Sequence, residues 1–132
     1  MAYNILLVDD SATVRAMISR MLNMSGIPLK ELHQAANGKE ALSLLRDHWI
    51  DLVLTDINMP EMDGIEMVRR MSEDGEMKTI PIVVVSTEGS ETRIESLKKM
   101  GVRKYLRKPF TPEAIKQVVE EILGGHNDGS NP

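Results

Sequence analysis

The chain has 132 residues, which fits a single domain with a core large enough to fold alone. Hydrophobic residues make up 42% and charged residues 27%, a balance typical of soluble globular domains, and the net charge of −4 argues against nucleic acid as the direct partner. The absence of cysteine excludes a disulfide framework, a thiol nucleophile and a cysteine-ligated zinc site.

The first strand-like run, residues 4–8, is apolar from Ile5 to Val8 and predicts a buried strand, which ends at the acidic pair Asp9 and Asp10. Its length is too small for the core of a signal peptide or for a membrane span. We therefore expect a cytoplasmic protein without membrane insertion.

A helix is predicted next, because Ser11 can cap it and apolar residues recur at helical spacing as far as about Met24. Met17, Met21 and Met24 follow this spacing. Such a methionine stripe can form an adaptable binding surface, but core packing is its commoner use, so we interpret it as part of the core.

Four further strand patterns and four further helix patterns alternate along the rest of the chain. The predicted strands cover residues 31–35, 51–55, 80–85 and 102–107. The predicted helices cover residues 38–48, 65–72, 91–100 and 112–124. This alternation predicts a parallel sheet with helices on both faces, in one domain over residues 1–125. Residues 126–132 are polar, and we expect a disordered tail.

Polar side chains stand at the ends of most of the predicted strands. They are Asp9 and Asp10 after the first strand, Asp56 after the third, Ser86 and Thr87 after the fourth, and Lys108 after the fifth. Each alone is more often structural than functional. In a doubly wound sheet, however, the carboxyl ends of the strands form the ligand crevice, so their convergence indicates a site.

Three neighbouring carboxylates would repel one another unless a cation lay among them, and oxygen ligands of this kind suit Mg²⁺. A carboxylate can also attack phosphorus to form an acyl phosphate. The charge of a transferred phosphoryl group must be neutralised. We expect Mg²⁺ to contact one of its oxygens, the Lys108 ammonium a second, and the Ser86 hydroxyl with backbone N–H groups a third.

Five separate motifs resemble those of the response-regulator receiver domain, and especially the stand-alone chemotaxis regulators of the CheY type. They are residues 6–11, 55–60, 62–64, 86–87 and 105–110. The likeness covers about residues 3–123. It implies a flavodoxin-like (βα)₅ doubly wound parallel sheet with strand order 2-1-3-4-5. It also implies a phosphorylation-activated response regulator of a two-component phosphorelay, not an enzyme, with a sensor histidine kinase as phosphodonor.

Matched motif by motif, the resemblance makes Asp56 the phospho-acceptor. It makes Asp10 a ligand of Mg²⁺ together with Asp56, and Asp9 a ligand either directly or through water. The backbone carbonyl of Asn58 would complete the protein's share of the ligands. Lys108 would pair with the phosphate. A phosphatase of the haloacid-dehalogenase type also uses a strand-end aspartate and Mg²⁺ and stays an alternative, although such enzymes place a second acid where Asn58 stands.

The resemblance also implies a switch, in which Ser86 follows the phosphate and Tyr105 then turns inward. It implies a cis peptide between Lys108 and Pro109. The segment around Tyr105 contains six basic residues: Lys98, Lys99, Arg103, Lys104, Arg107 and Lys108. We interpret this basic face as the docking surface for a downstream target protein, with an ordinary solvated face as the alternative.

Three positions near the acceptor would tune the lifetime of the phosphate. Asn58 and Glu88 match what chemotaxis regulators of this family usually carry, whereas Thr87 replaces a smaller alanine and would hinder access to the phosphoryl group. A receiver separated from a longer regulator stays open as an alternative. An inactive scaffold is disfavoured, because the complete set of site residues is present. We expect a monomer.

Overall fold

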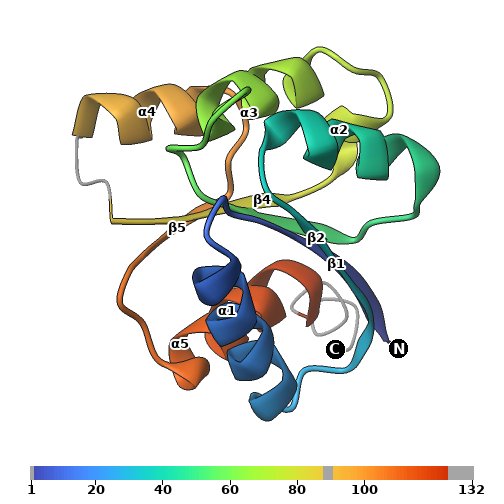
Figure 1. Ribbon diagram of the computed structural model, residues 1–132, viewed down its shortest axis with the longest axis vertical. Coiled ribbons are helices and arrows are strands. Elements are labelled where there is room, and N and C mark those ends of the chain that lie inside the picture. The colour runs from blue at the N-terminus through green and yellow to red at the C-terminus, as the bar shows by residue number, and fades with distance from the viewer. Residues whose placement is uncertain (1, 88–90, 125–132) are drawn as a thin grey trace, which may run out of the picture.

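The computed structural model describes residues 2–87 and 91–124; Glu88 and the predicted tail 126–132 lie outside these ranges. Strands and helices alternate throughout (Figure 1). The strands are β1 (Tyr3–Val8), β2 (Leu29–Ala35), β3 (Leu52–Thr55), β4 (Ile82–Ser86) and β5 (Lys104–Arg107). The α-helices are α1 (Ala12–Met24), α2 (Gly38–Asp47), α3 (Gly64–Ser72), α4 (Glu91–Lys99) and α5 (Pro112–Val119). A 3₁₀-helix, η1 (Met77–Thr79), precedes β4, and a π-helical segment, η2 (Glu120–Gly124), follows α5.

All strands pair in parallel in the order β2-β1-β3-β4-β5, so the predicted flavodoxin-like topology is confirmed. Figure 1 shows α1 and α5 on one face of the sheet and α2, α3 and α4 on the other. The strand order reverses between β1 and β3. The carboxyl ends of these two adjacent strands therefore border the crevice in which doubly wound proteins bind ligands.

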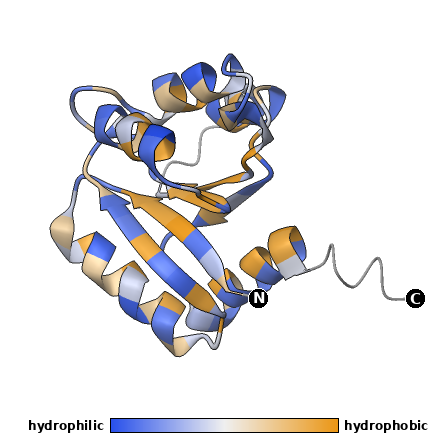
Figure 2. Ribbon diagram, turned by 90° about the vertical axis from the view of Figure 1, so that its right-hand side faces the viewer, coloured by the Kyte–Doolittle hydropathy of each residue, from blue (hydrophilic) through white to orange (hydrophobic). Residues whose placement is uncertain are grey.

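Side chains on both faces of the sheet are buried. Along β1, Ile5 and Leu7 belong to the core cluster beneath α1 and α5, whereas Leu6 and Val8 belong to the cluster on the opposite face. Because neighbouring residues of a strand point to opposite faces, burial on both sides requires a continuous apolar run instead of an alternating one. Figure 2 shows the hydrophobic residues gathered along the strands and on the inner sides of the helices.

The starts of four helices are fixed by side-chain caps. Ser11, Asn37, Asp63 and Thr111 each accept a hydrogen bond from the backbone N–H three residues further on. Each such cap contributes about 1 kcal/mol to stability. The caps at Ser11 and Thr111 confirm the predicted helix starts, and Pro112 occupies the first helical position, where no N–H is needed.

The fourth and fifth strands begin later than predicted, because turns use the preceding residues. Ile80 donates its N–H to the carbonyl of Met77, so it belongs to the turn after η1. Gly101 has a φ of 105°, and Val102 donates back to the carbonyl of Leu97. This is the hydrogen-bond pattern of a glycine-terminated helix, so Val102 completes the end of α4 and does not start β5.

The interpretation of the methionine stripe as core is wrong for two of its three residues. Met17 is 44% exposed and Met24 is 69% exposed, and only Met21 packs against the core cluster beneath α1. The buried side of α1 is centred on Ile18. At about 100° per residue, Met17 and Met24 lie roughly 100° and 120° around the helix from Ile18, on its flank.

No helix within residues 2–87 and 91–124 is both long and apolar enough to cross a membrane.

Candidate functional site

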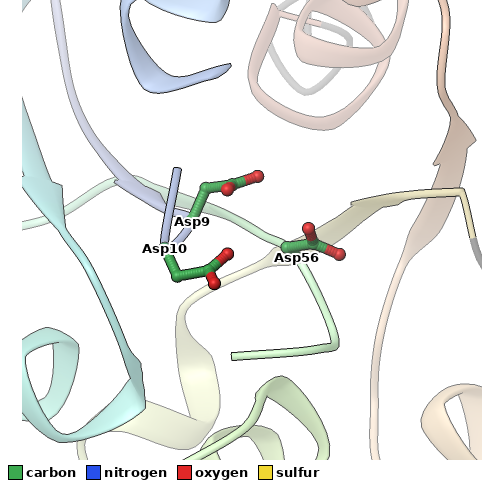
Figure 3. Close-up of side chains that lie close together, drawn as sticks. All are labelled: Asp9, Asp10 and Asp56. Carbon is green, nitrogen blue, oxygen red and sulfur yellow. The ribbon is translucent and has the colours of Figure 1, made fainter. Parts of the chain in front are cut away.

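Three carboxylates meet at the carboxyl ends of β1 and β3. Asp9 and Asp10 follow β1, Asp56 follows β3, and one oxygen of each lies within 4.8 Å of the others. Figure 3 shows the three side chains close together at the strand ends, with those of Asp9 and Asp10 extending toward Asp56. Asp9 is buried, Asp56 is half-buried and Asp10 is exposed, so the cluster extends from the interior at the strand ends to the surface.

Backbone N–H groups hold one oxygen of two of these carboxylates. Asp9 Oδ1 accepts from the N–H of Ser11 at 2.9 Å. Asp56 Oδ1 accepts from the N–H of Ile57 at 2.6 Å. In each case the second oxygen, Oδ2, is directed toward Lys108, so the orientation of both acids is fixed before any ligand binds.

Lys108 lies between the two acids. Its Nζ is 2.9 Å from Asp9 Oδ2 and 3.2 Å from Asp56 Oδ2. Burial by itself would lower the pKa of Lys108, but the hydrogen bond to Asp9 and the charge of Asp56 outweigh it, so this pKa is raised above its ordinary value. The peptide between Lys108 and Pro109 is cis, as the resemblance implies.

Arg15 supports the acidic pair, and sequence reasoning missed it. Its guanidinium donates to the backbone carbonyl of Asp9 at 2.6 Å and to Oε1 of Gln34 on β2 at 3.1 Å. The signal was present in the sequence, because Arg15 lies one helical turn after the cap Ser11 and therefore faces back toward the strand end.

The segment after Asp56 folds closely beneath it. The N–H of Gly64 donates to the carbonyl of Ile57 at 2.7 Å. A Cβ added to Gly64 would lie only 2.2 Å from the backbone oxygen of Asp56, so a side chain is sterically excluded there. Asn58 lies in this loop and is exposed. Sequence reasoning identified a loop here but did not predict the close approach of Gly64.

Ser86 and Tyr105 lie on the neighbouring strands. Ser86 is the last residue of β4 and is buried, and its carbonyl accepts the N–H of Lys108 at 3.0 Å. Thr87 follows and is exposed. Tyr105 pairs in register with Val84 and is half-buried against the core cluster beneath α4. The structure thus joins Ser86 to Lys108, whose ammonium contacts Asp9 and Asp56, and places Tyr105 on the next strand.

The predicted basic segment divides in two. Lys108 is directed at the acids and does not belong to the exposed surface. The other five residues are exposed and form what we call the basic face: Lys98, Lys99, Arg103, Lys104 and Arg107. Of these, Lys104 forms an ion pair with Glu121 at 3.2 Å.

Comparison with known proteins identifies relatives over almost the whole chain. Residues 5–120 match the response regulator receiver domain. The chain is 37% identical to a chemotaxis protein CheY homolog of Campylobacter jejuni over 128 residues, covering 96% of this chain and 97% of that protein. It is 39% identical to chemotaxis protein CheY1 of Helicobacter pylori over 121 residues, covering 91% and 96%. The structure of chemotaxis protein CheY4 of Vibrio cholerae superposes with a TM-score of 0.83 at 33% identity, covering 93% of this chain and all of that one.

Proposed function

The chain belongs to the response regulator receiver domain family, and from this premise we propose that Asp56 accepts the phosphoryl group. It is a receiver of the CheY type, a signalling domain that acts by phosphorylation in two-component chemotaxis systems, with a histidine kinase as phosphodonor. A haloacid-dehalogenase-type phosphatase and a receiver from a longer regulator are not favoured. We propose that the receiver domain covers residues 1–125.

One observation supports the choice of Asp56 among the three acids. It is half-buried at the end of the central strand β3, with one oxygen fixed by the N–H of Ile57 and the other facing Lys108. Asp9 makes the corresponding contacts with Ser11 and Lys108, but it is only 2% exposed. Asp56 therefore combines access from outside with an adjacent positive charge, which a nucleophilic carboxylate needs.

We propose that Asp9, Asp10, Asp56 and the backbone carbonyl of Asn58 hold Mg²⁺. The donor set fits, because all are hard oxygen ligands and the three carboxylates present oxygens within 4.8 Å of one another. Two oxygens on one Mg²⁺ lie at most about 4.2 Å apart, twice the ~2.1 Å bond length, so the carboxylates need to move little. When bound, Mg²⁺ supplies positive charge to the phosphoryl oxygens and offsets the repulsion among the acids.

In the proposed transfer, an oxygen of Asp56 bonds to phosphorus while the bond from phosphorus to the donor histidine nitrogen breaks, and that nitrogen keeps the electron pair. The chain's own contribution is positioning and charge. The N–H of Ile57 fixes the orientation of the Asp56 carboxylate, and the ammonium of Lys108, 3.2 Å away, is placed to bind the incoming phosphoryl oxygens. No separate base is required, because a carboxylate nucleophile has no proton to lose as it bonds to phosphorus.

The proposed switch joins the site to β5. Phosphorylation adds roughly −1.5 to −2 charges at Asp56. The hydroxyl of Ser86 and the ammonium of Lys108 would follow that charge. The backbone hydrogen bond between these two residues ties their movements together. Tyr105, three residues before Lys108, would then turn further inward and alter the face formed by α4, β5 and α5.

The rate at which the phosphate is lost would depend on the rim of the site. Asn58 and Thr87 are both exposed, each close in sequence to a site residue, so either side chain can contact an approaching water molecule. The β-branched Thr87 would restrict that approach. Glu88 is proposed for the same role by the resemblance.

The basic face around Tyr105 is proposed as the docking surface for an acidic downstream protein. Its five cations are solvent-exposed, so they would mainly increase the rate and selectivity of association. We propose a monomeric receiver that binds such a target without direct contact to nucleic acid.

The test is acyl-phosphate formation with acetyl phosphate and Mg²⁺, followed by intact mass. Asp56→Asn should abolish labelling. The matched control Asp63→Asn replaces another aspartate of the same region but keeps a side chain able to cap α3, and it should label normally. Undiminished labelling of Asp56→Asn would contradict the assignment.

A further inference from the structure

We propose a second binding site, at the amino-terminal ends of the strands and thus opposite the acidic cluster, that binds a lysine- or arginine-bearing segment of a partner protein. The site is a pocket of about 840 Å³ between the end of α2 and the connection from α3 to β4. In Figure 1 both of these segments lie on the right, away from the carboxyl ends of the strands. Ligand pockets commonly have volumes of roughly 300–1,000 Å³.

The pocket contains an exposed but anchored aromatic ring. Trp49 is the chain's one tryptophan, and its side chain is 78% exposed. Its indole N–H donates to Asp51 Oδ1 at 3.0 Å, and Asp51 Oδ2 in turn accepts the N–H of Asn4 at 2.8 Å. The backbone carbonyl of Trp49 accepts from the amide of Asn4 at 3.0 Å. The ring is therefore held by its polar edge, and its faces stay open to a ligand.

The charge around the ring is predominantly negative. Four carboxylates and one guanidinium line the pocket: Asp47, Asp51, Asp74, Glu76 and Arg46. Asp51 and Asp74 are occupied by hydrogen bonds from the protein itself. The carboxylates of Asp47 and Glu76 are exposed and bind no other group within the described part of the chain. These two acids are available to a cation from outside.

The floor of the pocket is apolar. Ile50 and Met77 are 5% and 7% exposed, and Ile80 is half-buried beside them. An aromatic face, an apolar floor and two unpaired carboxylates match one ligand chemistry. A lysine or arginine side chain has an aliphatic stem that buries on apolar surface and a cation that stacks on tryptophan and pairs with carboxylates.

A protein segment fits this pocket better than a free cation does. The pocket is shallow and open along one side, as it lies between a helix end and a loop, so a neighbouring surface can present side chains into it. It is also remote from the acidic cluster. A partner bound here would leave both Asp56 and the basic face accessible, which makes this interaction independent of the proposed phosphorylation.

The test is a titration of the full chain with an acetylated, amidated hexa-arginine peptide in saturating Mg²⁺. The native fluorescence of Trp49 reports binding, and amide NMR shifts locate it. The double variant Asp47→Asn/Glu76→Gln should bind at least fivefold more weakly. The control Glu113→Gln/Glu120→Gln removes the same charge from exposed residues of α5 and its C-terminal end, and it should bind as the native chain does.

Saturable binding with amide shifts at Ile50, Asp51 and Met77 is the expected result. Equal weakening in both double variants would show a general charge effect and overturn the proposal. Shifts centred on Asp9, Asp10 and Asp56, or the absence of saturable binding, would also overturn it. Light scattering of the chain alone tests whether the pocket instead binds a second copy of this chain. If the native chain were a dimer and Asp47→Asn/Glu76→Gln were a monomer, the pocket would bind a second copy, and the proposal of a partner protein would be refuted.

Discussion

Lys108 acts as the internal cation of the acidic cluster, and replacing it with methionine tests this role. Its ammonium lies 2.9 Å from Asp9, which is 2% exposed, and 3.2 Å from Asp56. Removing one partner of a buried ion pair leaves an uncompensated charge and typically costs about 3–5 kcal/mol. Because the site opens to solvent at Asp10, we expect the lower end, about 3 kcal/mol in the absence of divalent ions.

The assay is thermal and urea unfolding in chelator and then in Mg²⁺. At roughly 3–5 °C per kcal/mol for a chain of this size, Lys108→Met should lower Tm by about 10–15 °C in chelator. Mg²⁺ should recover part of the loss, and should bind Lys108→Met more tightly than the native chain, since the lysine neutralises the same carboxylates. Binding of a ligand at a hundred times its Kd stabilises by about 2.7 kcal/mol.

The matched control is Lys104→Met. Lys104 pairs with Glu121 at 3.2 Å, but both side chains are nearly half exposed, so its loss should cost less than about 1 kcal/mol. If Lys108→Met and Lys104→Met had similar effects in chelator, Lys108 would not be compensating a buried charge. If Mg²⁺ bound Lys108→Met more weakly, the proposed competition would be refuted.

Three further predictions concern other parts of the chain. Gly64→Ala should lower the free energy of unfolding by about 2 kcal/mol or more and impair labelling, because the new Cβ would lie 2.2 Å from a backbone oxygen. The control Gly75→Ala places a Cβ with nothing within 4 Å, so its free energy of urea unfolding should change by less than about 0.5 kcal/mol. Equal effects of the two substitutions would contradict the clash at Gly64. Arg15→Met removes the hydrogen bond to the carbonyl of Asp9 and should weaken Mg²⁺ affinity about tenfold by calorimetry, and an unchanged affinity would refute the positioning role. The hydrogen bonds from Arg69 and Arg70 lower the pKa of Glu66 to about 2. The stability that these bonds contribute is therefore present above pH 4.5 and is lost as the pH falls toward 2. A carboxyl NMR titration of Glu66 with a midpoint near 4.5 would contradict this.

The fold was predictable because its main signals are local. A continuous apolar run such as residues 5–8 specifies a strand buried on both faces, and Ser11 and Thr111 mark helix starts. The polar residues at the strand ends were informative because parallel strands bring those ends together. Their arrangement, which places Lys108 between Asp9 and Asp56, depends on side-chain directions across three strands and could not be read from the sequence.

What the sequence did not reveal depends on close approach or on a side chain reaching another element. The exclusion of a side chain at Gly64 arises from the path of the loop after Asp56, and glycine in a loop has many other uses. Arg15 reaches the carbonyl of Asp9 and Gln34 at once, which requires the orientation of α1 against β2. Met17 and Met24 show the converse error: helical spacing predicts which residues share a stripe, but not how wide the buried stripe is.

The energy needed for the proposed switch explains why several groups must contact the phosphate. Moving a two-state equilibrium from 1:99 to 99:1 takes about 5.5 kcal/mol. A hydrogen bond to a charged group contributes about 1.5–3 kcal/mol, so two to four new bonds are required. Lys108 cannot supply all of this, because it gives up existing bonds to Asp9 and Asp56 in order to bind phosphate. In the proposed switch, Mg²⁺, backbone N–H groups and the hydroxyl of Ser86 supply the remainder. Because the carbonyl of Ser86 accepts the N–H of Lys108, the proposed movement of Ser86 would be passed to the end of β5, the strand that carries Tyr105.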